Sequence, residues 1–73
     1  MTTKFFDMTI EANKIEDRDI LLNEDWRENK QVVLVAPRKE TNEVYVLVVN
    51  LEGGIESISF QQNEKVKISR GFE

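Results

Sequence analysis

The sequence predicts an all-β, mainly antiparallel domain in which five or six short strands curl into a small partial barrel. The first observation is a pair of runs rich in β-branched residues, Gln31–Ala36 and Val44–Val49, separated by the polar stretch Pro37–Glu43. Two such runs on either side of a turn-length segment are typical of a β-hairpin. The second observation is that the other apolar segments are equally short and are separated by polar or glycine-containing turns. Curling such strands removes most exposed edges, whereas a flat sheet of this size would leave one face bare.

The first half of the chain supplies three of the expected strands. In Phe5–Ile10, apolar residues at alternate positions predict a strand with one buried face. Asp19–Leu22 has the pattern of a short second strand, and Asn23–Asp25 that of a turn, because Asn and Asp tolerate left-handed backbone. We expect the third strand to begin at Trp26, to continue through Ala36 and to end at Pro37, since proline has no N–H to donate to a sheet.

Three further strands are expected in the second half. Val44–Val49 forms the second arm of the hairpin, and Gly53-Gly54 predicts the next turn because glycine readily adopts positive φ. Ile55–Phe60 and Lys65–Ser69 alternate apolar and polar residues, which predicts strands with one face in the core. The side chains of these two strands that we expect to face the core are Ile58, Phe60, Val66 and Ile68.

Length and composition narrow the range of functions. The 73 residues form one domain, residues 1–73, and contain neither cysteine nor histidine. Disulfides, the common zinc sites and the nucleophilic sites that depend on histidine or cysteine are therefore excluded. We expect a non-enzymatic protein without a cofactor. No apolar run approaches the roughly 18 residues of a membrane span, and no signal-like segment is present, so we expect a cytoplasmic protein that does not associate with membranes.

The net charge of −4 is concentrated near the N-terminus. Residues 1–28 contain eight acidic and four basic side chains, whereas residues 29–73 contain six of each. Such a chain is repelled by phosphate backbones, which argues against general nucleic-acid binding. The acidic third of the chain either keeps the protein soluble or forms a surface that meets a basic partner.

The order of several short motifs is informative. Asp19-Ile20-Leu21 enters a strand, Trp26-Arg27 follows the next turn, Gly53-Gly54 precedes the strand Glu56–Phe60, and Val66–Ile68 closes the chain. This order resembles the small SH3-like β-barrels found among bacteriophage and bacterial proteins of unknown role. The resemblance implies that fold and, for a phage-encoded chain, residence in the bacterial host cytoplasm, and it carries over no functional residue. Such proteins usually have glycine before the aspartate of the second strand, where this chain has Arg18.

The acidic third contains the first candidate site. Trp and Arg are the residues that most often dominate binding energy at interfaces, and Trp26-Arg27 follows directly after an acidic turn. We expect a host protein partner to contact this region, with Tyr45, the only tyrosine, as a second aromatic contact. The alternative is that Trp26 closes one end of the barrel and Arg27 pairs with a nearby acid. The partner-binding residues predicted here are Asp17, Asp19, Asp25, Trp26, Arg27 and Tyr45.

The central hairpin, Val32–Val49, is apolar on both of its faces. Strict alternation places Val32, Leu34 and Ala36 on one face of the first arm, and Val33 and Val35 on the other. The face that does not enter the core is either covered by Phe5–Ile10 or free to bind another protein. A second copy of the chain is one such partner, which would make the hairpin a homodimer interface.

Two other interpretations concern charged clusters. Lys65, Lys67 and Arg70, with Tyr45, provide an alternative face for a nucleotide or single-stranded nucleic acid, although no stacking aromatic is evident beside the lysines. The carboxylates of Glu16-Asp17-Arg18-Asp19 lack the glycine and distal glutamate of a calcium loop, so we expect no metal site. A further alternative is a structural accessory subunit, for example of a virion.

Overall fold

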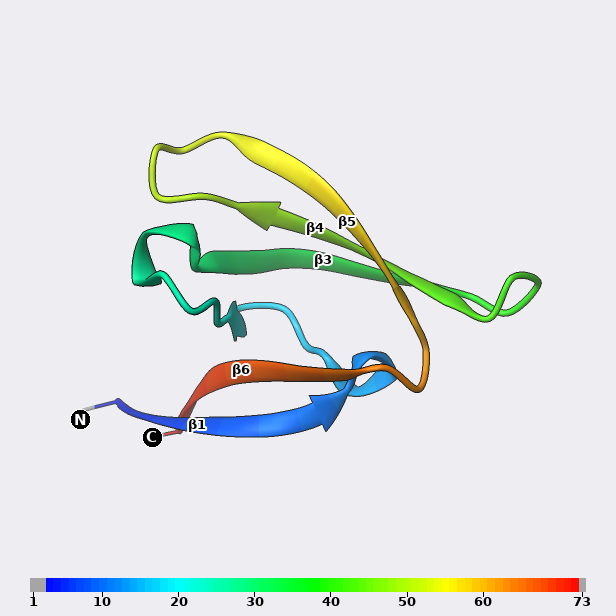
Figure 1. The fold of residues 1–73 in the computed structure, drawn as a ribbon, viewed down its shortest axis with the longest axis horizontal. Coiled ribbons are helices and arrows are strands. Elements are labelled where there is room, and N and C mark those ends of the chain that lie inside the picture. Colours follow the sequence, from blue (N-terminus) through cyan, green and yellow to red (C-terminus); the bar gives the residue numbers. More distant parts are fainter. Residues whose placement is uncertain (1–2, 73) are drawn as a thin grey trace.

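The computed structural model describes residues 3–72 as one curled antiparallel sheet (Figure 1). The spatial order of its strands is β1-β6-β2-β3-β4-β5. The prediction of a small, mainly antiparallel all-β domain with five or six strands is therefore confirmed. In chain order the elements are β1 (Lys4–Glu11), the 3-10 turn η1 (Ala12–Lys14), β2 (Ile20–Leu21), the 3-10 turn η2 (Trp26–Glu28), β3 (Lys30–Arg38), β4 (Glu43–Val49), β5 (Ile55–Gln61) and β6 (Lys65–Phe72).

The sheet is curled but not closed. Strands β1 and β5 form its two edges, and within residues 3–72 they do not pair with each other. The hairpin formed by β3 and β4, together with β5, lies opposite the β1–β6 pair (Figure 1). The short turn between β5 and β6 joins these two halves, although those strands are not neighbours in the sheet. This arrangement leaves an opening between β5 and the part of the sheet that contains β2 and β6.

The core lies on the concave face of the sheet. In β4 every second residue is fully buried, because the pleat directs Val44, Val46 and Val48 to that face. Ile68 is also fully buried, and Val66 is 9% exposed, as their alternation predicts. Ile58 and Phe60 are half-buried and pack against this cluster near the open side. The remaining core residues are Ala12, Ile15, Leu21 and Val32.

The boundaries predicted for β3 are wrong at both ends. The strand begins at Lys30 because Trp26–Glu28 forms η2 instead, with the Asp25 carboxylate accepting a hydrogen bond from the Arg27 backbone N–H at 3.0 Å. The strand also continues through Pro37, which pairs with Val44. In the described part of the chain, β2 pairs with no residue of β3 beyond Lys30 and Gln31. The later residues of β3 therefore form an edge on that side, where proline is tolerated.

A β-bulge at Val33 changes which residues of β3 face the core. Val32 pairs with Val48, but the next pair is Leu34 with Leu47, so Val33 is the extra residue. The bulge places Val32 and Val35 opposite core residues of β4, while Leu34 is 57% exposed. The strict alternation expected for this strand, with Val32, Leu34 and Ala36 on one face, is therefore wrong.

The outer face of the hairpin is not covered by the N-terminal segment. Phe5–Ile10 lies in β1, which pairs along its whole length with β6 at the opposite edge of the sheet from β5. Of the two alternatives for this face, coverage by Phe5–Ile10 within the monomer is therefore wrong. In the described chain Val33 and Leu34 are 44% and 57% exposed, and Leu47 and Val49 are half-buried.

Arg18, at the position where the resemblance implies a glycine, has a backbone conformation that glycine adopts more readily than other residues. Arg18 has φ of 75°, and its N–H donates to the Val32 carbonyl at 2.8 Å. A residue with a side chain in this region is strained, and a β-branched residue more so. We expect Arg18→Gly to be neutral or slightly stabilising and Arg18→Val to lower the free energy of unfolding by about 1–2 kcal/mol. Urea unfolding measures both, and equal stability of the two variants would contradict the assignment of strain to this turn.

Candidate functional site

A shallow groove lies where η2 approaches the turn between β4 and β5. It has a volume of about 390 Å³ and is lined by residues 26–28 of η2, residues 50–52 of the turn, and Glu56 of β5. We call it the Trp26 groove. Trp26 and Leu51 are 69% and 62% exposed, so the groove presents apolar surface to the solvent.

The segment that carries Trp26 is held by several hydrogen bonds. The Asn23 side chain donates to the Glu28 carbonyl at 2.7 Å, and the Asn29 side chain accepts from the Asn23 N–H at 2.7 Å. The Asp25 side chain caps η2 from the other end. These bonds fix the loop without burying Trp26, which therefore does not close the end of the barrel.

The opposite wall of the Trp26 groove is organised by Asn50. Its side-chain oxygen accepts from the N–H groups of Glu52 and Gly54 at 3.0 and 2.8 Å, and its amide nitrogen donates to Glu56 at 3.0 Å. Gly53 has φ of 87°, which confirms the predicted glycine turn. The turn is thus a defined structure that holds Leu51 in an exposed position.

Negative charge predominates in the Trp26 groove. Arg27 is paired with Asp25 at 3.1 Å, whereas Glu28, Glu52 and Glu56 all line the groove. The Arg27 side chain, and then its backbone N–H, lower the pKa of Asp25 below its ordinary value. The stability that this carboxylate contributes is therefore present above its unfolded pKa and is lost as the pH falls through the lower folded pKa.

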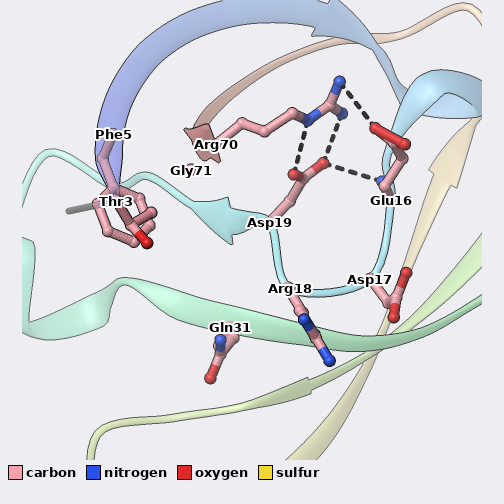
Figure 2. A pocket seen from close by; sticks show the side chains of 9 residues that line it. All are labelled: Thr3, Phe5, Glu16, Asp17, Arg18, Asp19, Gln31, Arg70 and Gly71. Atoms are coloured by element: carbon pink, nitrogen blue, oxygen red, sulfur yellow. Dashed lines mark hydrogen bonds and ion pairs between the residues drawn. The ribbon is translucent and has the colours of Figure 1, made fainter. Parts of the chain in front are cut away.

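Asp19 and Arg70 form a tie inside the protein rather than part of a contact surface (Figure 2). Asp19 is 2% exposed, and its two oxygens accept from Nε and Nη2 of Arg70 at 2.8 and 2.7 Å. Asp19 also accepts from the Glu16 N–H at 2.9 Å. Arg70 Nη1 pairs with Glu16 at 2.9 Å, and Nη2 donates to the Lys14 carbonyl at 3.1 Å. The expected exposure of Asp19 to a partner is therefore corrected, because it joins the loop before β2 to β6.

The arginine in this tie stays charged whenever the protein is folded. The hydrogen bonds to Asp19 raise the pKa of Arg70, and its partial burial opposes them. A raised pKa means that the stabilisation is present below the unfolded pKa and is lost only at still higher pH. This places the loss far above the neutral range, because arginine is protonated at every ordinary pH.

The remaining predicted partner residues do not gather around Trp26. Asp17 lies in the loop between η1 and β2 and lines a different pocket, together with Arg18 and Gln31 (Figure 2). Tyr45 projects from the outer face of β4, where the Arg38 guanidinium lies 4.8 Å from the centre of its ring. Tyr45 therefore does not line the Trp26 groove, and its contact with a partner stays a prediction. Of the six residues, Asp25, Trp26 and Arg27 remain together.

The alternative basic face is also divided. Alternation along β6 directs Lys65 and Lys67 to one side and Arg70 to the other, where it binds Asp19. The structure instead brings Lys30 and Phe60 to the two lysines, in a pocket of about 340 Å³. Neither residue was predicted at this face, because Lys30 comes from β3, which is distant in the chain, and alternation along β5 assigns Phe60 to the core.

Within residues 3–72, no group of three or more histidine, cysteine, aspartate or glutamate side chains is placed to hold a metal ion. The same part of the chain contains no helix with the length and apolar character needed to cross a membrane. No family model matches the chain, and no curated protein or solved structure matches it either.

Proposed function

We propose that this chain is a non-enzymatic binding protein whose Trp26 groove holds a basic segment of a partner protein. The observation that supports the proposal is an indole that is 69% exposed although its loop is fixed by hydrogen bonds. A tryptophan on a loop fixed in this way requires little ordering of the backbone on binding and buries a large apolar surface. Trp and Arg are also the commonest dominant residues of protein interfaces.

The chemistry of the groove favours a lysine or arginine of the partner. The aliphatic part of such a side chain would lie against Trp26 and Leu51, and its charge would lie close to the carboxylates of Glu28, Glu52 and Glu56. A cation over the indole face adds about 0.5–2 kcal/mol. An acidic partner would meet repulsion from the same carboxylates, so the groove discriminates by charge.

The biological setting forms a further part of the proposal. The chain is a small SH3-like protein of a bacteriophage or other mobile element, and it acts in the host cytoplasm by binding and modulating a host protein. The order of its motifs and its curled six-stranded sheet support this setting.

Binding of a labelled decalysine peptide tests the contribution of Trp26 and that of the acidic side chains of the groove separately. We expect Trp26→Ala to weaken its binding at least about tenfold, because a dominant interface residue contributes more than about 1–2 kcal/mol. Glu52→Lys should also weaken binding by replacing attraction with repulsion. Fluorescence anisotropy measures both. The controls outside the groove are Leu34→Ala, which truncates another exposed apolar residue, and Glu40→Lys, which makes the same change of charge. Wild-type affinity in Trp26→Ala would contradict the proposal, as would an equal effect of the two glutamate variants.

The exposed outer face of the hairpin favours a second interaction, the homodimer through Val32–Val49. Leu34 is 57% exposed, and in the described chain the later residues of β3 lack a partner on the β2 side. Apolar side chains beside a free strand edge suit pairing with a second copy. We expect Leu34→Lys to convert dimer to monomer in light scattering at equal protein concentration. A wild-type protein that stays monomeric at millimolar concentration would contradict this interface.

A further inference from the structure

A second pocket opens between β5 and the strands β2 and β6. It has a volume of about 340 Å³ and differs in chemistry from the Trp26 groove. We call it the lysine pocket. Apolar side chains from three strands and the residue after β2 line it, and lysines from β3 and β6 lie among them. The apolar residues are Leu21, Leu22, Ile58, Phe60 and Val66, and the lysines are Lys30, Lys65 and Lys67.

The lining of this pocket is positively charged in a protein of net charge −4. Its one acidic lining residue is Glu64 among the described residues, and this carboxylate accepts from the Gln61 N–H at 3.2 Å within the β5–β6 turn. Three lysines therefore line the pocket beside one carboxylate that is already engaged. This local reversal of charge separates the lysine pocket from the acidic surface elsewhere.

Lys30 is the most informative of the three lysines. Its side chain is only 15% exposed, although lysine is among the residues least often buried. In the described chain its ion pair is with Glu28, at the long distance of 3.8 Å. An ammonium group has three donors, so this single distant carboxylate leaves most of its hydrogen-bonding capacity for another acceptor. A bound anion would supply that acceptor and offset the cost of burying the charge.

We infer that the lysine pocket binds a small anionic molecule with an apolar or aromatic body. The head group would contact the ammonium groups, and the body would lie against Phe60 and Ile58. Mostly apolar lining with a few charged groups is the usual composition of a small-molecule site, and the volume lies at the lower end of the common range, about 300–1,000 Å³. A nucleic-acid polymer fits less well, because its many phosphates would meet the acidic surface outside the pocket.

Four probes test this inference on the full chain by isothermal titration and amide chemical shifts. Adenosine 5′-monophosphate and decanoate, the latter below its micelle concentration, each combine a charge with an apolar body. Inorganic phosphate has only the charge, and adenosine has only the body. We expect at least one of the first two to bind about tenfold or more tightly than both of the others, with shifts at Leu22, Lys30, Phe60 and Lys67. Equal binding of all four, or shifts elsewhere, would overturn the inference.

Two variants identify the groups that bind the head group, and two others serve as controls. Lys30→Met keeps the aliphatic volume and Lys67→Gln changes an exposed position, so the second remains informative if the first fails to fold. Each should weaken binding about tenfold, whereas Lys39→Gln in the hairpin loop should have no effect. Trp26→Ala should also have no effect, which makes the result independent of the proposed protein-binding function. Unchanged affinity in Lys67→Gln and in a folded Lys30→Met, or preference for a single-stranded oligonucleotide over all four probes, would contradict the inference.

Discussion

Replacing Asp19 with asparagine is expected to lower the free energy of unfolding by about 3 kcal/mol. The substitution keeps the shape of the side chain but leaves the Arg70 guanidinium without its charged partner, and breaking a buried pair costs about 3–5 kcal/mol. We expect the lower end of this range because the Arg70 side chain is 22% exposed and water can reach it. A domain of this length has a total stability of about 4–11 kcal/mol, so the loss is a large fraction of the whole.

Urea unfolding followed by circular dichroism measures this effect. Asp17→Asn is the matched control, since Asp17 is an exposed aspartate of the same loop. It should change the free energy of unfolding by no more than about 0.5 kcal/mol, as is usual for surface substitutions. Similar losses in the two variants would show that the Asp19–Arg70 tie does not stabilise the fold.

Replacing Ile68 with alanine is expected to have a comparable effect for a different reason. Ile68 is fully buried in β6, where it pairs with Met8 of β1 and Leu21 of β2. Removing three carbons from this position leaves a cavity between the two halves of the curled sheet. Large-to-small substitutions in a core cost about 2–5 kcal/mol, and the thin core of a small domain offers few residues that can move to fill the space.

The same isoleucine-to-alanine change at position 55 provides the control. Ile55 is 68% exposed at the start of β5, so its substitution should cost less than about 0.5 kcal/mol. Thermal unfolding of the two variants compares them directly. A smaller loss for Ile68→Ala than for Ile55→Ala would mean that the concave face is not the core.

The strands could be predicted because their signals are local. Alternation in β4 and β6 correctly places Val46 and Ile68 in the core, and the paired glycines correctly predict the turn before β5. The start of β3 could not be predicted, because capping by Asp25 makes Trp26–Glu28 a turn although Trp and Arg are also acceptable in a strand. The bulge at Val33 could not be predicted either, because every neighbouring residue in this run is aliphatic and none indicates an interruption of the alternation.

The same distinction holds for the candidate sites: residues adjacent in the chain could be grouped from the sequence, whereas residues distant in the chain could not. Asp25, Trp26 and Arg27 are adjacent in the chain, so any local structure keeps them close together. Asp19 and Arg70 are 51 positions apart, and the sequence gives no indication that they pair. The lysine pocket takes residues from four strands. Phe60 lies just before the turn into β6, but only the fold brings Lys30 of β3 to the lysines of β6.

An amide chemical-shift map of the nitrogen-15-labelled protein, titrated with decalysine, is the most direct test of the proposed binding function. We expect the largest shifts in residues 26–28 and 50–56, which form the two walls of the Trp26 groove, and in the Trp26 indole N–H. A decaglutamate peptide should leave these signals unchanged. If decalysine shifts only the amide signals of the loop before β2, or shifts those of all acidic residues equally, the result would contradict binding in the groove.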